Sequence, residues 1–131
     1  MQQFQRDYYE TLMSVDESIG RVQKWLKDHN LDKNTIIMVM GDNGFMFGEH
    51  GLIDKRTAYE ESMRVPLIAS GPGIAKNKVV EDIVANIDIA PTILDAAGIK
   101  KPANYDGESF LGLGTDRKDL PPRNDSFVYE Y

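Results

Sequence analysis

The chain has 131 residues, 21 acidic and 15 basic side chains, and a formal net charge of −6. This length predicts a single domain, and a hydrophobic fraction of 41% excludes a disordered or collagen-like chain. The acidic balance argues against nucleic-acid binding. No apolar run approaches the roughly 20 residues of a membrane span. Because the chain has no cysteine, disulfides, thiolate zinc sites and cysteine nucleophiles are excluded.

The first segment predicts a long amphipathic helix from about residue 5 to about residue 29. Apolar residues recur every three or four positions and define one helical face. They are Tyr8, Leu12, Val15, Ile19, Val22 and Leu26. Trp25 widens the face that we expect to be buried. Gly20 predicts a close-packed neighbour, since glycine costs about 1 kcal/mol in a helix interior, and Asn30 tolerates the left-handed conformation that ends a helix.

Two apolar strands are expected after this helix. The continuous run of residues 35–40 predicts a strand buried on both faces, as in a parallel sheet. The second strand is expected over residues 65–70, where Pro66 restricts it to an edge, a strand start or a bulge. A helix, a turn and a buried strand form half of an α/β unit, so the sequence predicts an α/β fold.

Two shorter helices complete the expected elements. One is expected over residues 57–63. The other is capped by Asp88 and runs to about Ala97, with Pro91 in its first turn and Gly98 after its end. A last strand is expected over residues 126–131, and because so short a strand needs a partner, we expect the chain to be part of a larger domain.

The chemistry is expected in the glycine-rich loop after the first strand, residues 41–59, which we call the site loop. Ligands of open α/β sheets bind outside the carboxyl ends of the strands, where Asp42 and Asn43 stand. A carboxylate beside a carboxamide supplies hard oxygens that suit Ca²⁺ or Mg²⁺. Lys55 offers a compact positive charge for an anionic group, and His50 lies between them in sequence.

Plainer interpretations compete with a functional one. The pair Asn43-Gly44 is also the strongest short hairpin signal, so this segment can be only a turn. A lone histidine such as His50 is more often a surface or hydrogen-bonded residue than a functional one. Lys55 beside Arg56 is usually a solvated pair. Composition alone leaves these alternatives open.

The order of the sequence blocks favours a functional interpretation. In chain order they are Asp42-Asn43-Gly44, Gly48-Glu49-His50-Gly51, Lys55, Tyr59-Glu60-Glu61-Ser62, Arg64-Val65-Pro66-Leu67-Ile68, Gly71-Pro72-Gly73, residues 86–98 and Asp106-Gly107-Glu108-Ser109-Phe110. In this order they resemble the type I sulfatases over nearly the whole chain. The run Ile53-Asp54-Lys55-Arg56 and residues 87–98 look closest to N-acetylglucosamine-6-sulfatases and mucin-desulfating enzymes.

The resemblance implies an alkaline-phosphatase-like α/β fold with three layers and a mostly parallel central sheet. It implies that Asp42 and Asn43 are metal ligands of one divalent cation, usually Ca²⁺, and that catalytic Lys55 contacts the sulfate ester. His50 and Arg56 are further candidates for substrate binding. The implied activity is hydrolysis of sulfate from a sulfated carbohydrate such as N-acetylglucosamine-6-sulfate, in a periplasmic, secreted or lysosomal protein.

The chain also departs from the family pattern. The family nucleophile lies in a Cys/Ser-x-Pro-x-Arg motif; Ser70-Gly71-Pro72 begins it, but Ile74 stands where arginine is required. Asp42 and Asn43 offer at most three oxygens, whereas Ca²⁺ takes about six to eight. We therefore expect residues 1–131 to be the C-terminal portion of a sulfatase catalytic domain. By itself this portion is expected to be inactive and to self-associate through exposed edges and apolar faces.

Two alternatives remain. The first is a phosphatase- or phosphodiesterase-type member of the same superfamily. Asn43 argues against it, since those relatives tend to carry a histidine there, a nitrogen ligand fit for Zn²⁺. The second is a non-catalytic interaction domain, which the missing nucleophile favours.

Overall fold

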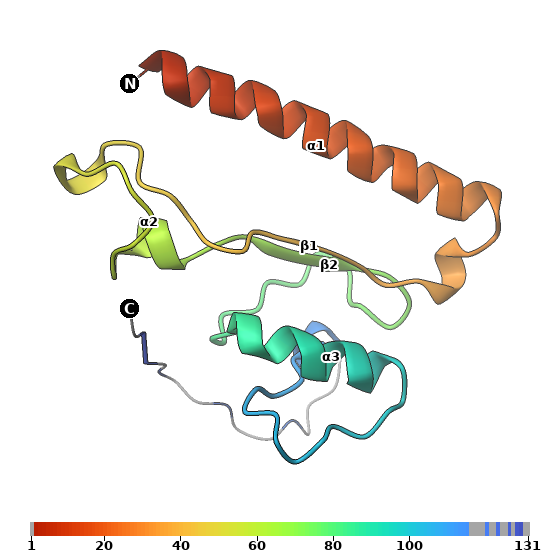
Figure 1. The fold of residues 1–131 in the computed structure, drawn as a ribbon. Helices are drawn as coiled ribbons and strands as arrows, with labels where there is room; N and C mark the ends of the chain where they lie inside the picture. Colours follow the sequence, from red (N-terminus) through yellow and green to blue (C-terminus); the bar gives the residue numbers. More distant parts are fainter. Residues whose placement is uncertain (1, 116–119, 121–122, 124–125, 127, 130–131) are drawn as a thin grey trace. The chain divides into compact units, whose positions relative to one another are not determined.

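The computed structural model describes residues 2–115, 120, 123, 126, 128 and 129 (Figure 1). Its helices and strands are α1 (Gln2–Asp28), β1 (Ile37–Met40), α2 (Glu60–Met63), β2 (Leu67–Ser70) and α3 (Ile89–Ala96), with short 3₁₀ turns η1 (Asp32–Asn34), η2 (Glu49–Gly51), η3 (Asn86–Asp88) and η4 (Leu111–Gly114). The chain divides into two compact units, residues 1–72 and 73–130. Of the last strand expected over residues 126–131, the structure describes residues 126, 128 and 129, and none of these three lies in a strand.

The predicted long helix is confirmed as α1, the red-to-orange helix of Figure 1. It ends where the left-handed residue was expected, because Asn30 has φ 57°. The Asn30 N–H donates to the Lys27 carbonyl at 3.1 Å, and the Leu31 N–H donates to the Leu26 carbonyl at 2.8 Å. These bonds satisfy carbonyls at the end of the helix that have no partner within it.

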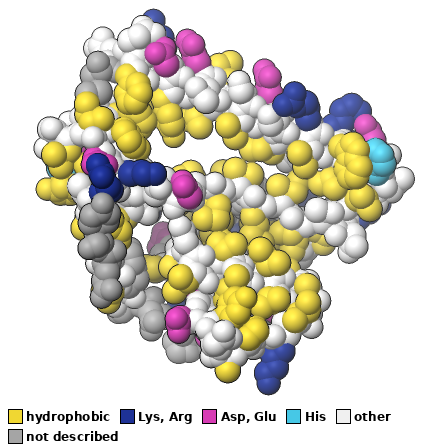
Figure 2. Space-filling view, viewed as in Figure 1, with side chains coloured by type: hydrophobic (Ala, Val, Ile, Leu, Met, Phe, Trp, Pro, Cys, Tyr) yellow, Lys and Arg dark blue, Asp and Glu magenta, His cyan; other side chains and the backbone are white. Residues whose placement is uncertain are grey.

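The apolar face of α1 is far more exposed than the sequence predicts. Leu26 is the one buried residue among the described residues of this helix. Four others on the face are 43–53% exposed, namely Tyr8, Leu12, Val15 and Val22. Trp25 does not widen a buried face but stacks on His29, with ring centroids 4.1 Å apart. Apolar side chains are accordingly visible along this helix in Figure 2.

Gly20 has no close-packed neighbour, which corrects the expectation from sequence. Among the described residues, no heavy atom beyond its own helical turn lies within 4 Å of the position that a Cβ would take. Gly20→Ala is therefore expected to stabilise unit 1 by about 1 kcal/mol, the helix-propensity difference. Urea unfolding followed by Trp25 fluorescence measures this.

The control for Gly20→Ala is Gly51→Ala in the same unit. Gly51 also has open space around it, but its φ is 73°, a conformation that costs a residue with a Cβ about 1–2 kcal/mol. Alanine should therefore stabilise the protein at position 20 and destabilise it at position 51. A loss of stability from Gly20→Ala would mean that a neighbour does pack there.

The two apolar strands form, but they pair with each other in antiparallel orientation. Ile37 lies opposite Ser70 and Met40 opposite Leu67. All four residues of β1 are only half-buried, so the prediction of a strand buried on both faces is wrong for this chain. In the described part of the chain β1 has one strand neighbour, and the parallel neighbours expected from the resemblance are not among the described strands. Pro66 directly precedes β2, a permitted position for proline.

Unit 2 is organised around Asp88, which stands at the N-cap position of α3. Its carboxylate makes no bond to the first N–H groups of that helix, contrary to the capping role expected from sequence. It accepts the N–H of Ala85 at 3.0 Å and that of Glu108 at 2.8 Å, and pairs with the guanidinium of Arg123. Because Asp88 is buried, these donors stabilise its charge, and they tie residues 106–110 to α3.

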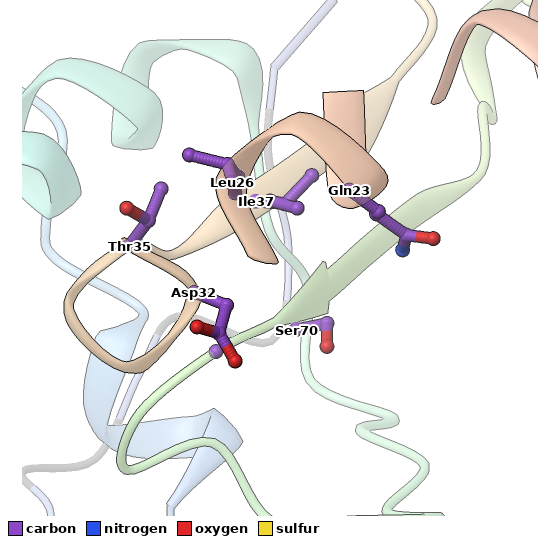
Figure 3. A pocket seen from close by; sticks show the side chains of 7 residues that line it. Gln23, Leu26, Asp32, Thr35, Ile37 and Ser70 are labelled. Atoms are coloured by element: carbon purple, nitrogen blue, oxygen red, sulfur yellow. The ribbon is translucent and has the colours of Figure 1, made fainter. Parts of the chain in front are cut away.

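A small pocket of about 180 Å³ lies at the start of β1 (Figure 3). Its lining includes Leu26, Asp32, Thr35, Ile37 and Ser70. Since Asp42 follows the opposite end of β1, this pocket is separate from the candidate site.

Candidate functional site

The site loop leaves β1 at its carboxyl end, as the sequence predicts. The partner of β1 is β2, and residues 41–66 connect them, so Asn43-Gly44 is not the tight turn of a two-residue hairpin. The Asn43 N–H donates to Asp42 Oδ1 at 2.8 Å, and the Asn43 side-chain amide donates to the Gly44 carbonyl at 2.9 Å. These two bonds fix the orientation of the Asn43 carboxamide.

The structure brings Lys55 and Asn43 together. Lys55 Nζ donates to Asn43 Oδ1 at 3.3 Å, across twelve positions of sequence. The amide oxygen that we expect to face a metal ion therefore faces a positive charge here. This contact joins two of the predicted site residues next to Asp42.

A buried junction holds the two arms of the site loop together. The Met46 N–H donates to the Asp54 carbonyl at 2.8 Å, and the Met46 side chain is fully buried. The Thr57 hydroxyl contacts Met46 Sδ at 3.6 Å and the Ser62 hydroxyl at 2.9 Å. Lys55 thus projects from a segment that is anchored on both sides.

Gly44 fits the site loop against α2. Its N–H donates to the Ser62 carbonyl at 2.8 Å, and a Cβ at this position would lie 2.0 Å from the Glu61 carbonyl oxygen. Only a glycine allows this backbone approach, because real Cβ atoms do not come so close to an oxygen. The glycine beside the expected ligand Asn43 is therefore required by packing.

Asp54 and Arg56 flank Lys55 and bind each other. Arg56 Nε lies 3.0 Å from both Asp54 carboxylate oxygens, and Arg56 Nη2 lies 2.8 Å from Oδ2. The Lys55 N–H also donates to Asp54 Oδ1 at 2.6 Å. The Arg56 bonds, followed by this backbone bond, lower the pKa of Asp54 from 3.8 to about 2.

This pKa predicts how the ion pair depends on pH. Because the folded pKa lies below the unfolded value, the pair contributes to stability above about pH 4 and loses that contribution as the pH falls towards 2. A carbon-detected NMR titration should give a pKa near 2 for the Asp54 carboxyl. In the variant Arg56→Gln, the titration midpoint of the Asp54 carboxyl should move back towards 3.8. An unchanged midpoint would show that Arg56 is not the main cause of the lowered pKa.

His50 contacts a different set of residues from Lys55. Its ring stacks on Tyr59, with centroids 3.9 Å apart and an angle of 10°, and its Nε2 lies 3.3 Å from Glu61 Oε2. The backbone of His50 has φ 55°, so the ring leaves a left-handed turn. Sequence reasoning missed the roles of Tyr59 and Glu61, because the two glutamates at this point also suit the start of a helix.

Aromatic side chains join the site loop to the start of α1. The ring of Phe47 lies 4.9 Å from that of Tyr8 and 5.3 Å from that of Phe4, between centroids. Phe45 adds an edge-on contact with Phe47 at 5.1 Å. These contacts position the loop. An aromatic pair of this type contributes about 0.5–1.5 kcal/mol to stability in addition to the burial of apolar surface.

Asp42 and Asn43, which follow β1, are of the residue types that bind a divalent cation, but two residues are too few to complete such a site. The carboxylate of Asp42 and the amide oxygen of Asn43 are hard ligands of the type that Ca²⁺ and Mg²⁺ prefer. Within the described ranges, no group of three histidine, cysteine, aspartate or glutamate side chains is arranged to hold a metal ion. Further ligands are therefore needed to complete a site that includes Asp42 and Asn43.

Comparison with known proteins settles the family. The sulfatase family model matches residues 1–99. The chain belongs to the sulfatase family. It is 45% identical over 109 residues to N-acetylglucosamine-6-O-sulfatase of Bacteroides thetaiotaomicron, covering 82% of this chain and 20% of the relative. It is 42% identical over 124 residues to the extracellular sulfatase SULF-1 homolog of Drosophila melanogaster, an alignment that covers 92% of this chain and 11% of the relative.

Solved structures share the fold of this sulfatase chain. One, a complex with its substrate D-glucosamine-2-N,6-O-disulfate, matches with a TM-score of 0.76 and 40% identity, covering 80% of this chain and 22% of the other. The phosphonate monoester hydrolase of Silicibacter pomeroyi matches with a TM-score of 0.72 and 37% identity. This match covers 82% of this chain and 22% of the hydrolase chain. The α/β, alkaline-phosphatase-like fold expected from sequence is thus confirmed.

The chain spans about a fifth of the length of most of these proteins. The relatives include sulfatases named as extracellular. In the part of the chain that the structure describes, no helix has the length and apolar character needed to cross a bilayer.

Proposed function

We propose that the protein containing these residues is a sulfuric ester hydrolase that removes sulfate from a sulfated sugar, with N-acetylglucosamine-6-sulfate as the type substrate. The contact between Lys55 Nζ and Asn43 Oδ1 carries this proposal, since it puts a positive charge against a hard oxygen atom next to Asp42, after the carboxyl end of β1. Relatives of this sulfatase chain that act on N-acetylglucosamine 6-sulfates support the choice of sugar.

Each site residue has a proposed role. Lys55 neutralises charge on the sulfuryl oxygens, which develops as the ester bond breaks. Asp42 and Asn43 are two ligands of a divalent cation, proposed to be Ca²⁺, which when bound would polarise the same oxygens. His50 and Arg56 are proposed to contact the sugar or the sulfate, and their side chains are 42% and 62% exposed.

The nucleophile is proposed to come from another part of the catalytic domain. Residues 1–131 contain no Cys/Ser-x-Pro-x-Arg motif, so they are proposed to be the C-terminal portion of that domain and to lack turnover alone. The exposed apolar face of α1 supports self-association of this portion. Light scattering tests this: a sharp monomer peak would contradict it. Export from the cytoplasm, to the periplasm, cell exterior or lysosome, is proposed from the extracellular relatives.

The test is a substrate panel with the full-length protein. The panel comprises N-acetylglucosamine-6-sulfate, glucose-6-sulfate and a phenyl phosphonate monoester, compared by kcat/KM. We expect the first to be hydrolysed fastest. No hydrolysis of either sulfated sugar would contradict the proposal.

A second candidate is phosphonate monoester hydrolysis. It is supported by the structural similarity of this chain to the Silicibacter pomeroyi enzyme. The TM-score of that match, 0.72, is only slightly below the 0.76 of the match to the sulfated-glucosamine complex. A higher kcat/KM for the phosphonate than for either sulfate ester would favour this second function.

A further inference from the structure

We propose that Asp54 is a positioning residue for Lys55: it fixes the backbone from which the lysine reaches Asn43. This inference rests on the proposed function of Lys55 and assigns a role to a neighbour that sequence reasoning left unassigned. It is drawn from the contacts of Asp54, which involve both its main chain and its side chain.

Asp54 holds the lysine segment from two directions. Its carbonyl accepts the N–H of buried Met46 at 2.8 Å, which ties the segment to the arm of the loop that carries Asn43. Its Oδ1 accepts the N–H of Lys55 at 2.6 Å, which fixes the start of the lysine residue itself. Only the side chain of Lys55 is then left to adjust between its Cα and Asn43.

Arg56 keeps the Asp54 carboxylate in that orientation. Its guanidinium engages both oxygens through three contacts of 2.8–3.0 Å, a geometry that fixes the plane of the carboxylate. The pair Arg64–Glu60, in the same unit, makes a single contact at 3.4 Å with both side chains at least 70% exposed. The sequence suggests only a solvated pair of Lys55 and Arg56, whereas in the structure the Arg56 guanidinium is bound to Asp54.

Precise placement of Lys55 matters for catalysis. A displacement of about 1 Å in a group that acts on the transition state costs about 100-fold in rate. A lysine side chain loses rotamer entropy when it is fixed, so a rigid backbone lowers the cost of presenting the ammonium group. Loss of the Asp54 side chain should thus lower turnover through Lys55.

A double-mutant cycle in the full-length protein tests this. Asp54→Ala is expected to lower kcat for the sulfated sugar about tenfold, with a smaller change in KM. In a Lys55→Ala background, Asp54→Ala is expected to cause no further loss, because a positioning residue acts only through the residue that it positions. Asp54→Asn keeps an acceptor for the Lys55 N–H and should recover part of the rate.

Glu60→Ala is the matched control, since it removes one carboxylate from an exposed ion pair of the same unit and should leave kcat unchanged. Circular dichroism and thermal unfolding verify the fold of each variant. Equal losses from Asp54→Ala with and without Lys55 would overturn the positioning role, as would full activity of Asp54→Ala. If Lys55→Ala itself retains full activity, the proposed function of Lys55 fails first.

Discussion

Replacing Lys55 by alanine in the full-length protein should lower kcat/KM for a sulfated sugar by about 10²–10³-fold. This is the usual cost of removing one group that stabilises transition-state charge. The ammonium lies 3.3 Å from Asn43 Oδ1, beside Asp42, and no smaller side chain at position 55 reaches that place. Steady-state kinetics with N-acetylglucosamine-6-sulfate measures the loss.

The control for this variant is Lys24→Ala. Lys24 forms an exposed pair with Asp28 on α1, so its removal deletes the same charge without touching the site loop. Its kcat/KM should match that of the unaltered protein. If Lys55→Ala is equally active, Lys55 does not act on the sulfate ester.

Gly44→Ala has the second large expected effect, on stability as well as activity. The new Cβ would meet the Glu61 carbonyl oxygen at 2.0 Å, so the site loop must move away from α2 and lose the bond from Gly44 to Ser62. Overpacking and one lost hydrogen bond together cost about 2–4 kcal/mol. Urea unfolding followed by Trp25 fluorescence measures the stability.

Activity separates Gly44→Ala from a general loss of stability. At a temperature where both proteins remain folded, the shifted loop should still lower kcat, because Asn43 moves relative to Lys55. Gly20→Ala, which adds the same methyl group where there is space, should leave kcat unchanged. Wild-type stability and activity in Gly44→Ala would show that the loop tolerates a different packing.

Local signals in the sequence predicted the elements well. The apolar spacing from Tyr8 to Leu26 identified α1, and Asn30 marked its end, because both depend on interactions within a few residues. The apolar runs around β1 and β2 were also correct as strands. Their antiparallel pairing was not predicted, since the orientation of two strands depends on the course of residues 41–66 between them.

Burial and the contacts of side chains were harder to predict. The exposure of Trp25 and the open space at Gly20 depend on which layers pack on α1, and no local pattern contains that information. In the site loop, the motif order pointed to Asp42, Asn43 and Lys55, and the structure brings Lys55 and Asn43 together. The stacking of His50 on Tyr59 and the bonds of Asp54 join residues through turns whose geometry follows only from the folded loop.

The antiparallel pairing of β1 with β2 also bears on how much the loop between them can vary in length. The pair closes a loop of residues 41–66, and the entropy of closing a flexible loop grows only with the logarithm of its length. Doubling such a loop costs only about 0.6 kcal/mol. Insertions at exposed positions such as Leu52 or Ile53 are therefore expected to change the surface of the site loop at a small cost in stability, while the strand pair and the buried Met46 junction remain.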